Sequence, residues 1–101
     1  MNVLVTGANR GLGLGIVKEM LKQDKVKHVF ATHRHLSDFE ELLSITDLRL
    51  HVMQMDLRDR MMIGSIGVKV ADIVGRDGLN VIVNNAAVLE PYDMDKRVNR
   101  R

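Results

Sequence analysis

Three glycines stand close together near the start of the chain, directly after a short apolar run. Gly7, Gly11 and Gly13 follow residues 3–5 and precede a segment whose apolar residues have helical spacing. Glycine permits positive φ angles and lets a ligand approach the backbone closely. A helix that begins after such a turn directs N–H groups and the positive end of its dipole at a phosphate. The pattern predicts a dinucleotide-binding turn, and a flexible loop after a strand is the alternative.

Basic side chains follow the second predicted strand, and residues at this position distinguish NAD sites from NADP sites. His33, Arg34 and His35 lie about 20 residues after the glycines, where NAD sites place a carboxylate on the ribose 2′-OH and NADP sites an arginine. Arg34 can donate two N–H groups to a 2′-phosphate. We therefore predict NADP(H) rather than NAD(H), with a merely solvated arginine as the alternative. The two histidines lack further ligands, so no metal site is predicted.

Short apolar runs alternate with segments of helical spacing, which is typical of strand–helix–strand units around a parallel sheet. In the third predicted strand, Leu48, Leu50 and Val52 alternate with polar residues. Right-handed crossovers place the first two helices on one face and the third on the other. The predicted fold class is α/β: a Rossmann-like half with a parallel sheet of about four strands in the order 3-2-1-4 and helices on both faces. Strands are expected at 2–6, 28–32, 48–55 and 81–83, and helices after residue 11, before residue 44 and after residue 59.

Local signals mark the starts of two of these helices. Ser37 and Glu40 have the spacing of a capping box. In this motif the Ser37 hydroxyl accepts a hydrogen bond from the third helical N–H, and the Glu40 side chain reaches back to the N–H of Ser37. Asp59 is expected to cap the third helix. Gly64 and Gly67 weaken that helix by up to ~1 kcal/mol each relative to alanine, unless they permit close packing against a neighbour.

Two further motifs follow the glycine turn in order. Asp56-Leu57 comes after the third predicted strand, and Asn84-Asn85-Ala86-Ala87 comes after the fourth. Together with Thr-Gly-Ala-Asn-Arg-Gly-Leu-Gly at 6–13, they resemble the short-chain dehydrogenase/reductase family over nearly the whole chain. Within that family, residues 9–15 most resemble the carbonyl-reductase branch that includes the sniffer proteins, which are NADPH-dependent reductases of aldehydes and ketones.

The resemblance implies roles for individual residues. Asp56 and Leu57 would hold the adenine, the segment from Asn84 would support the central strand and line the adenosine ribose, and Arg10 would lie near the same phosphate as Arg34. Ala87 departs from the family, which usually has glycine there, so its methyl group either crowds the cofactor or is absorbed by a loop shift. For Asp56, a turn or helix-capping role is the alternative. The residues expected to bind NADP(H) are Gly7, Asn9, Arg10, Gly11, Leu12, Gly13, Arg34, Asp56, Leu57, Asn84 and Ala86.

No catalytic residue is assigned. Tyr92 and Lys96 have the Tyr-x-x-x-Lys spacing of the family's catalytic pair, but they follow Ala87 too closely, whereas the family carries the pair tens of residues later. We expect an NADP(H)-binding half-domain at 1–90 and a loop with a basic tail at 91–101. The chain is accordingly expected to be truncated and inactive alone, with a small carbonyl substrate bound only by a full-length form.

Composition narrows the remaining classes. The chain has 101 residues, 46% of them hydrophobic, and no cysteine, which suits one globular domain without disulfides. No apolar stretch approaches the ~20 residues that span a bilayer, so a cytoplasmic protein without membrane association is expected. A net charge of +2 is too small to indicate a nucleic-acid partner. The exposed edge of the fourth strand favours dimerisation. Two alternatives stay open: a non-catalytic NADP(H)-binding module that pairs with a full-length relative, and an interaction protein whose basic tail binds RNA.

Overall fold

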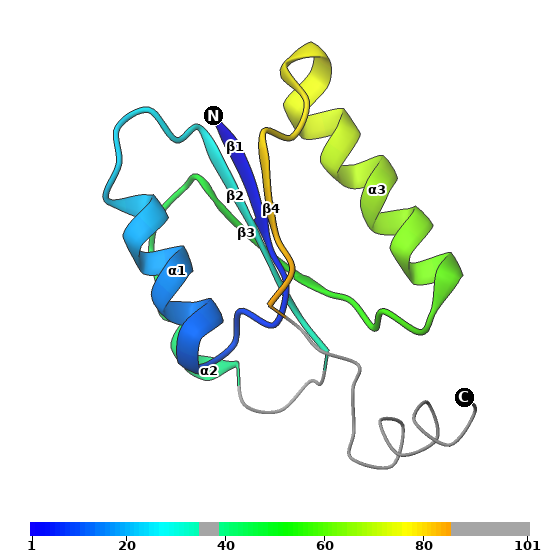
Figure 1. Cartoon of the computed structure of the whole chain (residues 1–101), viewed down its shortest axis with the longest axis horizontal. Coiled ribbons are helices and arrows are strands. Elements are labelled where there is room, and N and C mark those ends of the chain that lie inside the picture. The colour runs from blue at the N-terminus through cyan, green and yellow to red at the C-terminus, as the bar shows by residue number, and fades with distance from the viewer. Residues whose placement is uncertain (35–38, 86–101) are drawn as a thin grey trace, which may run out of the picture.

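The computed structural model describes residues 1–34 and 39–85 (Figure 1). All strand pairs are parallel, and the sheet has the order β3-β2-β1-β4. The predicted order is therefore confirmed. The elements in chain order are β1 (Asn2–Val5), α1 (Gly11–Leu21), β2 (His28–His33), α2 (Glu40–Leu43), β3 (Leu50–Gln54), α3 (Arg60–Val74), a short 3-10 helix (Gly75–Asp77) and β4 (Val81–Val83).

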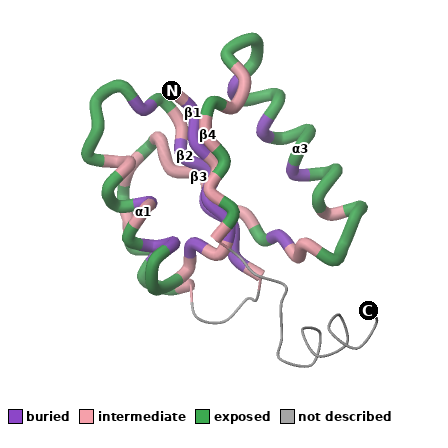
Figure 2. The backbone as a smooth tube through the Cα atoms, viewed as in Figure 1, coloured by how far each residue is buried: buried purple, intermediate pink, exposed green. Residues whose placement is uncertain are grey.

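Helices cover both faces of the sheet, with α1 and α3 on opposite sides (Figure 1). The burial pattern in Figure 2 follows this layering, since the buried stretches lie in the strands and along the inward sides of the helices. On one face, α1 and α2 enclose an apolar cluster that includes Val3, Val5, Val17, Val29 and Leu42. On the other face, α3 encloses a second cluster made of Phe30, Met55, Ile66, Val70 and Val74. The predicted distribution of the helices is confirmed.

The third helix begins and packs as its sequence indicates. The Asp59 carboxylate accepts a hydrogen bond from the Met62 N–H at 3.1 Å, which is the predicted cap. A Cβ atom built on Gly64 or Gly67 would meet nothing within 4 Å. The close packing considered for these glycines is therefore not found among the described residues.

The third strand begins two residues later than predicted. Leu48 is fully exposed, and the strand starts at Leu50. Asp47 accepts a bond from the Arg49 N–H at 2.9 Å, which turns the chain just before the strand. The Arg49 guanidinium also donates to the carbonyl oxygens of Gln23 at 2.9 Å and Val26 at 3.0 Å, so distant parts of the chain fix this turn.

The second helix is shorter than predicted. It begins at Glu40, and Phe39 occupies its N-cap position without a side-chain cap bond. The helix start therefore differs from the expected capping box, whose Ser37 lies outside the described residues. In the described part of the chain, no helix is long and apolar enough to cross a membrane.

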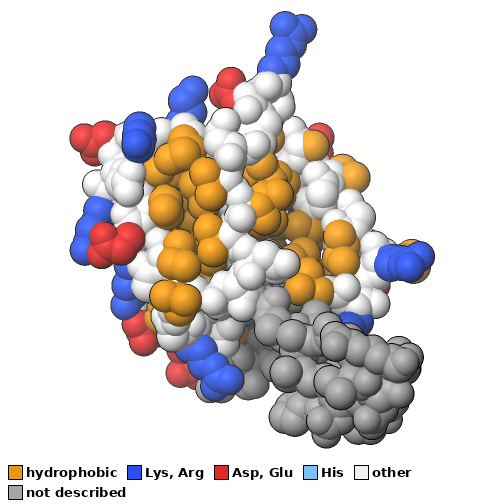
Figure 3. Space-filling model, viewed as in Figure 1, with side chains coloured by type: hydrophobic (Ala, Val, Ile, Leu, Met, Phe, Trp, Pro, Cys, Tyr) orange, Lys and Arg blue, Asp and Glu red, His pale blue; other side chains and the backbone are white. Residues whose placement is uncertain are grey.

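An apolar groove of about 510 Å³ separates α3 from β4 on the side of the sheet that α3 covers. Leu4, Ile66, Val70, Leu79 and Ile82 are among its lining residues. Figure 3 shows hydrophobic side chains gathered on the molecular face between α1 and α3. Ile82, in the middle of β4, is 62% exposed, which is unusual because parallel sheets are normally buried on both faces.

Candidate dinucleotide-binding site

The glycine turn lies at the carboxyl end of β1 and leads directly into α1. Gly7 has φ 60° and Gly11 has φ 58°, a region that side chains disfavour. Ala8 is fully buried, and its N–H donates to the Thr32 carbonyl at 2.9 Å. The turn is therefore anchored to the end of β2, which favours a fixed turn over the flexible loop considered as an alternative.

Gly13 serves close packing instead of backbone conformation. A Cβ atom at this position would lie 2.2 Å from the Gly7 carbonyl oxygen and 2.8 Å from Asn85 Nδ2. At Gly11, by contrast, a Cβ atom would meet nothing within 4 Å, so the surface beside the start of the helix is open. Gly7 and Gly11 thus have the positive φ angles expected of the turn, and Gly13 allows the turn and the helix to pack closely. The close approach of a ligand to this backbone stays a prediction.

Residues after β4 brace the same turn. The Asn85 Nδ2 group donates to the Gly7 carbonyl at 3.0 Å, and the Thr6 hydroxyl donates to Asn84 Oδ1 at 3.0 Å. The Thr6 N–H also bonds the Val83 carbonyl at 3.0 Å. Asn84 thus supports the central strand, while its place beside the ribose stays a prediction. Ala86 and Ala87 lie outside the described residues.

The start of α1 suits an anion. Arg10 is the N-cap residue, with no side-chain cap bond, and the first turn contains no acidic residue. Leu12 is 72% exposed beside it. Because the N-terminal N–H groups of a helix carry partial positive charge, a pyrophosphate fits this end of the helix.

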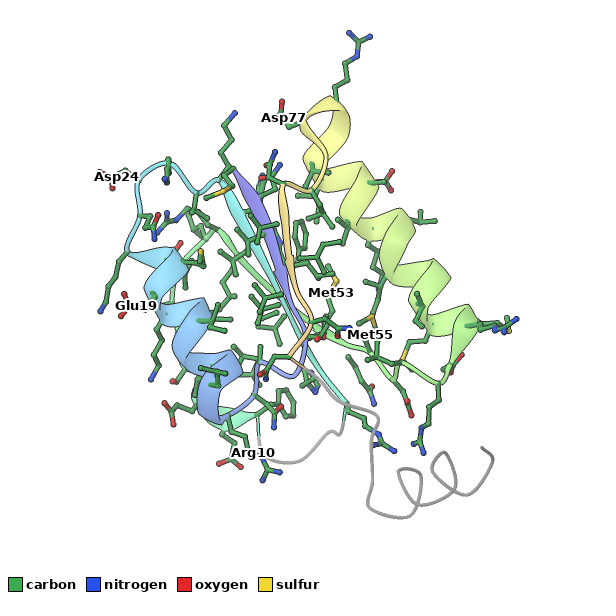
Figure 4. The ribbon with its side chains drawn as sticks, in the orientation of Figure 1. Arg10, Glu19, Asp24, Met53, Met55 and Asp77 are labelled. Carbon is green, nitrogen blue, oxygen red and sulfur yellow. The ribbon has the colours of Figure 1, made fainter. Side chains whose placement is uncertain are left out.

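Two glutamates with no predicted place in the site share a hollow with Arg10. Asn9, Arg10, Glu40 and Glu41 line a hollow of about 250 Å³ (Figure 4 labels Arg10). The Glu41 carboxylate pairs with Lys18 at 2.6 Å. The hollow beside Arg10 therefore holds carboxylates as well as a guanidinium, and the Lys18 ammonium pairs with one of these carboxylates. Only the placement of α2 beside the glycine turn reveals this, because the two segments are distant in the sequence.

Arg34 and Asp56 come together at the carboxyl ends of β2 and β3. Arg34 Nε lies 3.8 Å from Asp56 Oδ2, and Arg58 Nη2 lies 3.1 Å from the same oxygen. Hydrogen bonds from the Arg58 side chain, and then from its backbone N–H, lower the pKa of Asp56 to about 2, with a smaller contribution from the charge of Arg34. Asp56 thus makes the turn considered as an alternative role, and its contact with adenine stays a prediction. Arg58 was not assigned to the site from the sequence.

Leu57 points elsewhere than its neighbour Asp56. It packs against the apolar cluster around Phe30 and lines the groove between α3 and β4. Its predicted contact with adenine stays a prediction, and its observed role is to anchor the loop after β3.

The histidines have structural partners. His33 is 4% exposed and stacks on Phe39, with ring centroids 4.2 Å apart. His28 Nδ1 and His51 Nε2 lie 3.0 Å apart across β2 and β3. Among the described residues there is no group of three or more His, Cys, Asp or Glu side chains that could hold a metal. His35 lies outside them, as do Tyr92 and Lys96.

Comparison with known proteins settles the family. The sequence model of the short chain dehydrogenase family matches residues 1–100. The chain is a member of this family. Human NADPH carbonyl reductase 3 is 38% identical to this family member over 90 residues, a match that covers 84% of the chain and 31% of the human protein. The family inferred from the three motifs is thereby confirmed.

Solved structures of short-chain dehydrogenases match the fold. Sniffer of Caenorhabditis elegans is 43% identical, with a TM-score of 0.82, over 88% of this chain and 38% of that protein. The NADPH-bound carbonyl reductase from chicken fatty liver is 31% identical, with a TM-score of 0.80, over 94% of this chain and 40% of that enzyme. These relatives confirm the carbonyl-reductase and sniffer branch. This short-chain dehydrogenase spans less than a third of the length of the curated relatives it matches.

Proposed function

We propose that this chain binds NADP(H) at the carboxyl edge of its sheet, as the nucleotide-binding half of a reductase of aldehydes and ketones. The observation that carries the proposal is the glycine turn. Gly7 and Gly11 have positive φ angles, and Gly13 packs against the Gly7 carbonyl. In this geometry helix α1 begins at an open surface, and no side chain caps its first N–H groups. A pyrophosphate bound there is stabilised by backbone N–H groups.

The preference for NADP(H) over NAD(H) rests on Arg34. It is the residue directly after β2, where an NAD site would present a carboxylate to the ribose. The Gln54 side chain donates to the Arg34 carbonyl at 3.3 Å, which holds this backbone near the edge of the sheet. The NADPH-bound structural relative and the human NADPH carbonyl reductase support the same cofactor.

The chemistry is divided between cofactor and protein. A bound nicotinamide supplies the hydride that a carbonyl carbon accepts. The described residues bind and orient: the turn holds the pyrophosphate, Asn84 lines the ribose, and Asp56 contacts the adenine. Leu57 packs against the cluster around Phe30 and so holds the loop that carries Asp56. No described residue is proposed as the proton donor. The chain spans less than a third of its curated relatives. We propose that carbonyl reduction belongs to the whole protein, and that the described residues supply cofactor binding without activity of their own.

A non-catalytic module that pairs with a full-length relative is the second candidate. The exposed apolar groove beside β4 favours it, because an apolar surface of this kind is typical of a protein contact. Dimerisation through the β4 edge belongs to the same proposal, and a cytoplasmic location stays a prediction.

Calorimetric titration of the chain with NADPH and NADH tests the proposal. We expect NADPH to bind at least about tenfold more tightly, since one charge-assisted pair is worth about 1.5–3 kcal/mol. Arg34→Gln should remove this difference. Arg76→Gln is the matched control, because Arg76 lies before β4 at the opposite end of the sheet. Equal or tighter binding of NADH would overturn the proposed cofactor, and carbonyl reduction by the chain alone would overturn its proposed inactivity.

A further inference from the structure

The Asp56 carboxylate has two arginine neighbours, and they contact it differently. Arg58 donates to Asp56 Oδ1 from its backbone N–H at 3.0 Å and from Nε at 3.1 Å, and to Oδ2 from Nη2 at 3.1 Å. Arg34 approaches Oδ2 only to 3.8 Å, beyond hydrogen-bond distance. Arg58 therefore occupies the carboxylate, and Arg34 is a neighbour without a hydrogen bond to it.

Arg34 has hydrogen-bonding capacity left over. Its Nε is buried and has no hydrogen-bond partner in the structure, although its side chain as a whole is 31% exposed. A buried N–H group without a hydrogen bond raises the free energy of the folded chain, so a hydrogen bond from Arg34 to a nearby anionic oxygen is favourable. The Asp56 carboxylate is within reach, since it follows β3, Arg34 follows the adjacent strand β2, and Asp56 Oδ2 lies 3.8 Å from Arg34 Nε.

We propose that Arg58 sets the preference for a 2′-phosphate without contacting the cofactor, because it holds the Asp56 carboxylate and so keeps Arg34 available for the phosphate. Without Arg58, Asp56 would turn to Arg34 and form a two-point pair, the most favourable geometry for a guanidinium and a carboxylate. The phosphate would then have to compete with this internal anion. Arg58 is thus a positioning residue that acts through Asp56, and the inference rests on the proposed NADP(H) site.

Two small nucleotides isolate this part of the site. Adenosine 2′,5′-bisphosphate carries the 2′-phosphate, and adenosine 5′-monophosphate lacks it, so neither depends on a nicotinamide pocket. In calorimetric titrations of the full chain, Arg58→Gln should weaken the bisphosphate about three- to fivefold, as for a partly screened ion pair, and leave the monophosphate within about twofold. Arg60→Gln is the matched control: it removes one exposed cation at the start of α3 and should change neither affinity.

A double-mutant cycle separates action through Asp56 from a direct contact. In an Asp56→Asn background, no carboxylate is left to capture Arg34, so adding Arg58→Gln should not change the preference for the bisphosphate. A loss that persists in this background would mean that Arg58 binds the phosphate itself, and it would overturn the inference. A wild-type chain that does not prefer the bisphosphate would overturn the proposed NADP(H) function. A wild-type preference that Arg58→Gln leaves intact would overturn only the role of Arg58.

A measurement without nucleotide tests the same exchange of partners. The pKa of the Asp56 carboxyl, followed by NMR, is about 2 in the wild-type chain. In Arg58→Gln it should rise but stay below the usual 3.8, because Arg34 then pairs with the carboxylate oxygens that Arg58 no longer contacts. Adding Arg34→Gln should return the pKa to its usual value. If Arg58→Gln alone restored that value, Arg34 would not have paired with Asp56 and the inference would be wrong. Circular dichroism checks that each variant is folded.

Discussion

The contact between Gly13 and Gly7 makes a quantitative prediction for Gly13→Ala. The new methyl carbon would lie 2.2 Å from the Gly7 carbonyl oxygen, whereas ordinary contact begins near 3.4 Å, so the two atoms must separate by about 1.2 Å. Overpacking of this kind costs about 1–3 kcal/mol. Weakening the 3.0 Å bond from Asn85 to the Gly7 carbonyl costs about 1 kcal/mol more. Alanine returns up to ~1 kcal/mol of helix propensity. The net loss is about 2 kcal/mol, or roughly 8–16 °C in Tm for a domain of this size.

Gly15→Ala is the matched control in the same helix. A Cβ atom at Gly15 would meet nothing within 4 Å, so this variant should gain up to ~1 kcal/mol from helix propensity alone. Urea denaturation of both variants and the wild type, followed by circular dichroism at 222 nm, gives the two free energies of unfolding. The reasoning fails if Gly13→Ala is as stable as the wild type, or if both variants shift in the same direction.

Three further predictions follow from other contacts. Asp59→Ala should lower the free energy of unfolding by about 1 kcal/mol in urea titrations, because the Met62 N–H loses its acceptor, while Asp59→Asn should retain most of it; equal losses would contradict the cap. Burial, and then the charge of His28, lowers the pKa of His51 below its usual 6.5, so the unfolded chain binds a proton more readily than the folded chain and the free energy of unfolding should fall as the pH drops below about 6.5. Urea midpoints measured from pH 8 to 5 should fall less in His51→Gln than in the wild type, and parallel curves for the two proteins would exclude the effect. Ile82→Lys should abolish concentration-dependent sedimentation by charging the exposed middle of β4, and a wild type that sediments as a monomer throughout would count against the dimer.

The arrangement of the sheet could be predicted because local and long-range signals agree. Continuous apolar runs specify buried parallel strands, and right-handed crossovers then leave only a handful of strand orders, among which 3-2-1-4 is that of a dinucleotide-binding half. The start of β3 could not be predicted in this way. Leu48 fits the alternating pattern, but the bonds of Arg49 to the chain between α1 and β2 turn the backbone before the strand begins. Contacts of this kind depend on the assembled fold and leave no periodic trace in the sequence.

In the candidate site, too, local features could be predicted from the sequence and contacts between distant segments could not. The spacing of Gly7, Gly11 and Gly13 predicted a tight turn, because positive φ angles and close packing are local needs of the backbone. The contact of this turn with a nucleotide stays a prediction. The presence of carboxylates beside Arg10 could not be predicted from the sequence, since Glu40 lies in the same hollow only because helix α2 packs beside the turn. The contacts of Arg58 had a weak local signal, an arginine two residues after an aspartate that ends a strand, which is the spacing of an Asx turn.

The nucleotide turn and the exposed groove share one strand. The Thr6 N–H bonds the carbonyl of Val83, and Asn85 holds the Gly7 carbonyl, so the turn has its braced geometry only when β4 is in place. The same strand presents Ile82 to the apolar groove. A protein segment that covers the groove would stabilise β4 and therefore the turn, because a ligand of the folded form shifts the equilibrium toward it. Linkage requires the converse as well: nucleotide bound at the turn must strengthen association at the groove by the same factor. Sedimentation with and without NADPH would reveal this coupling, and an association constant that does not change with NADPH would show that the two sites are independent.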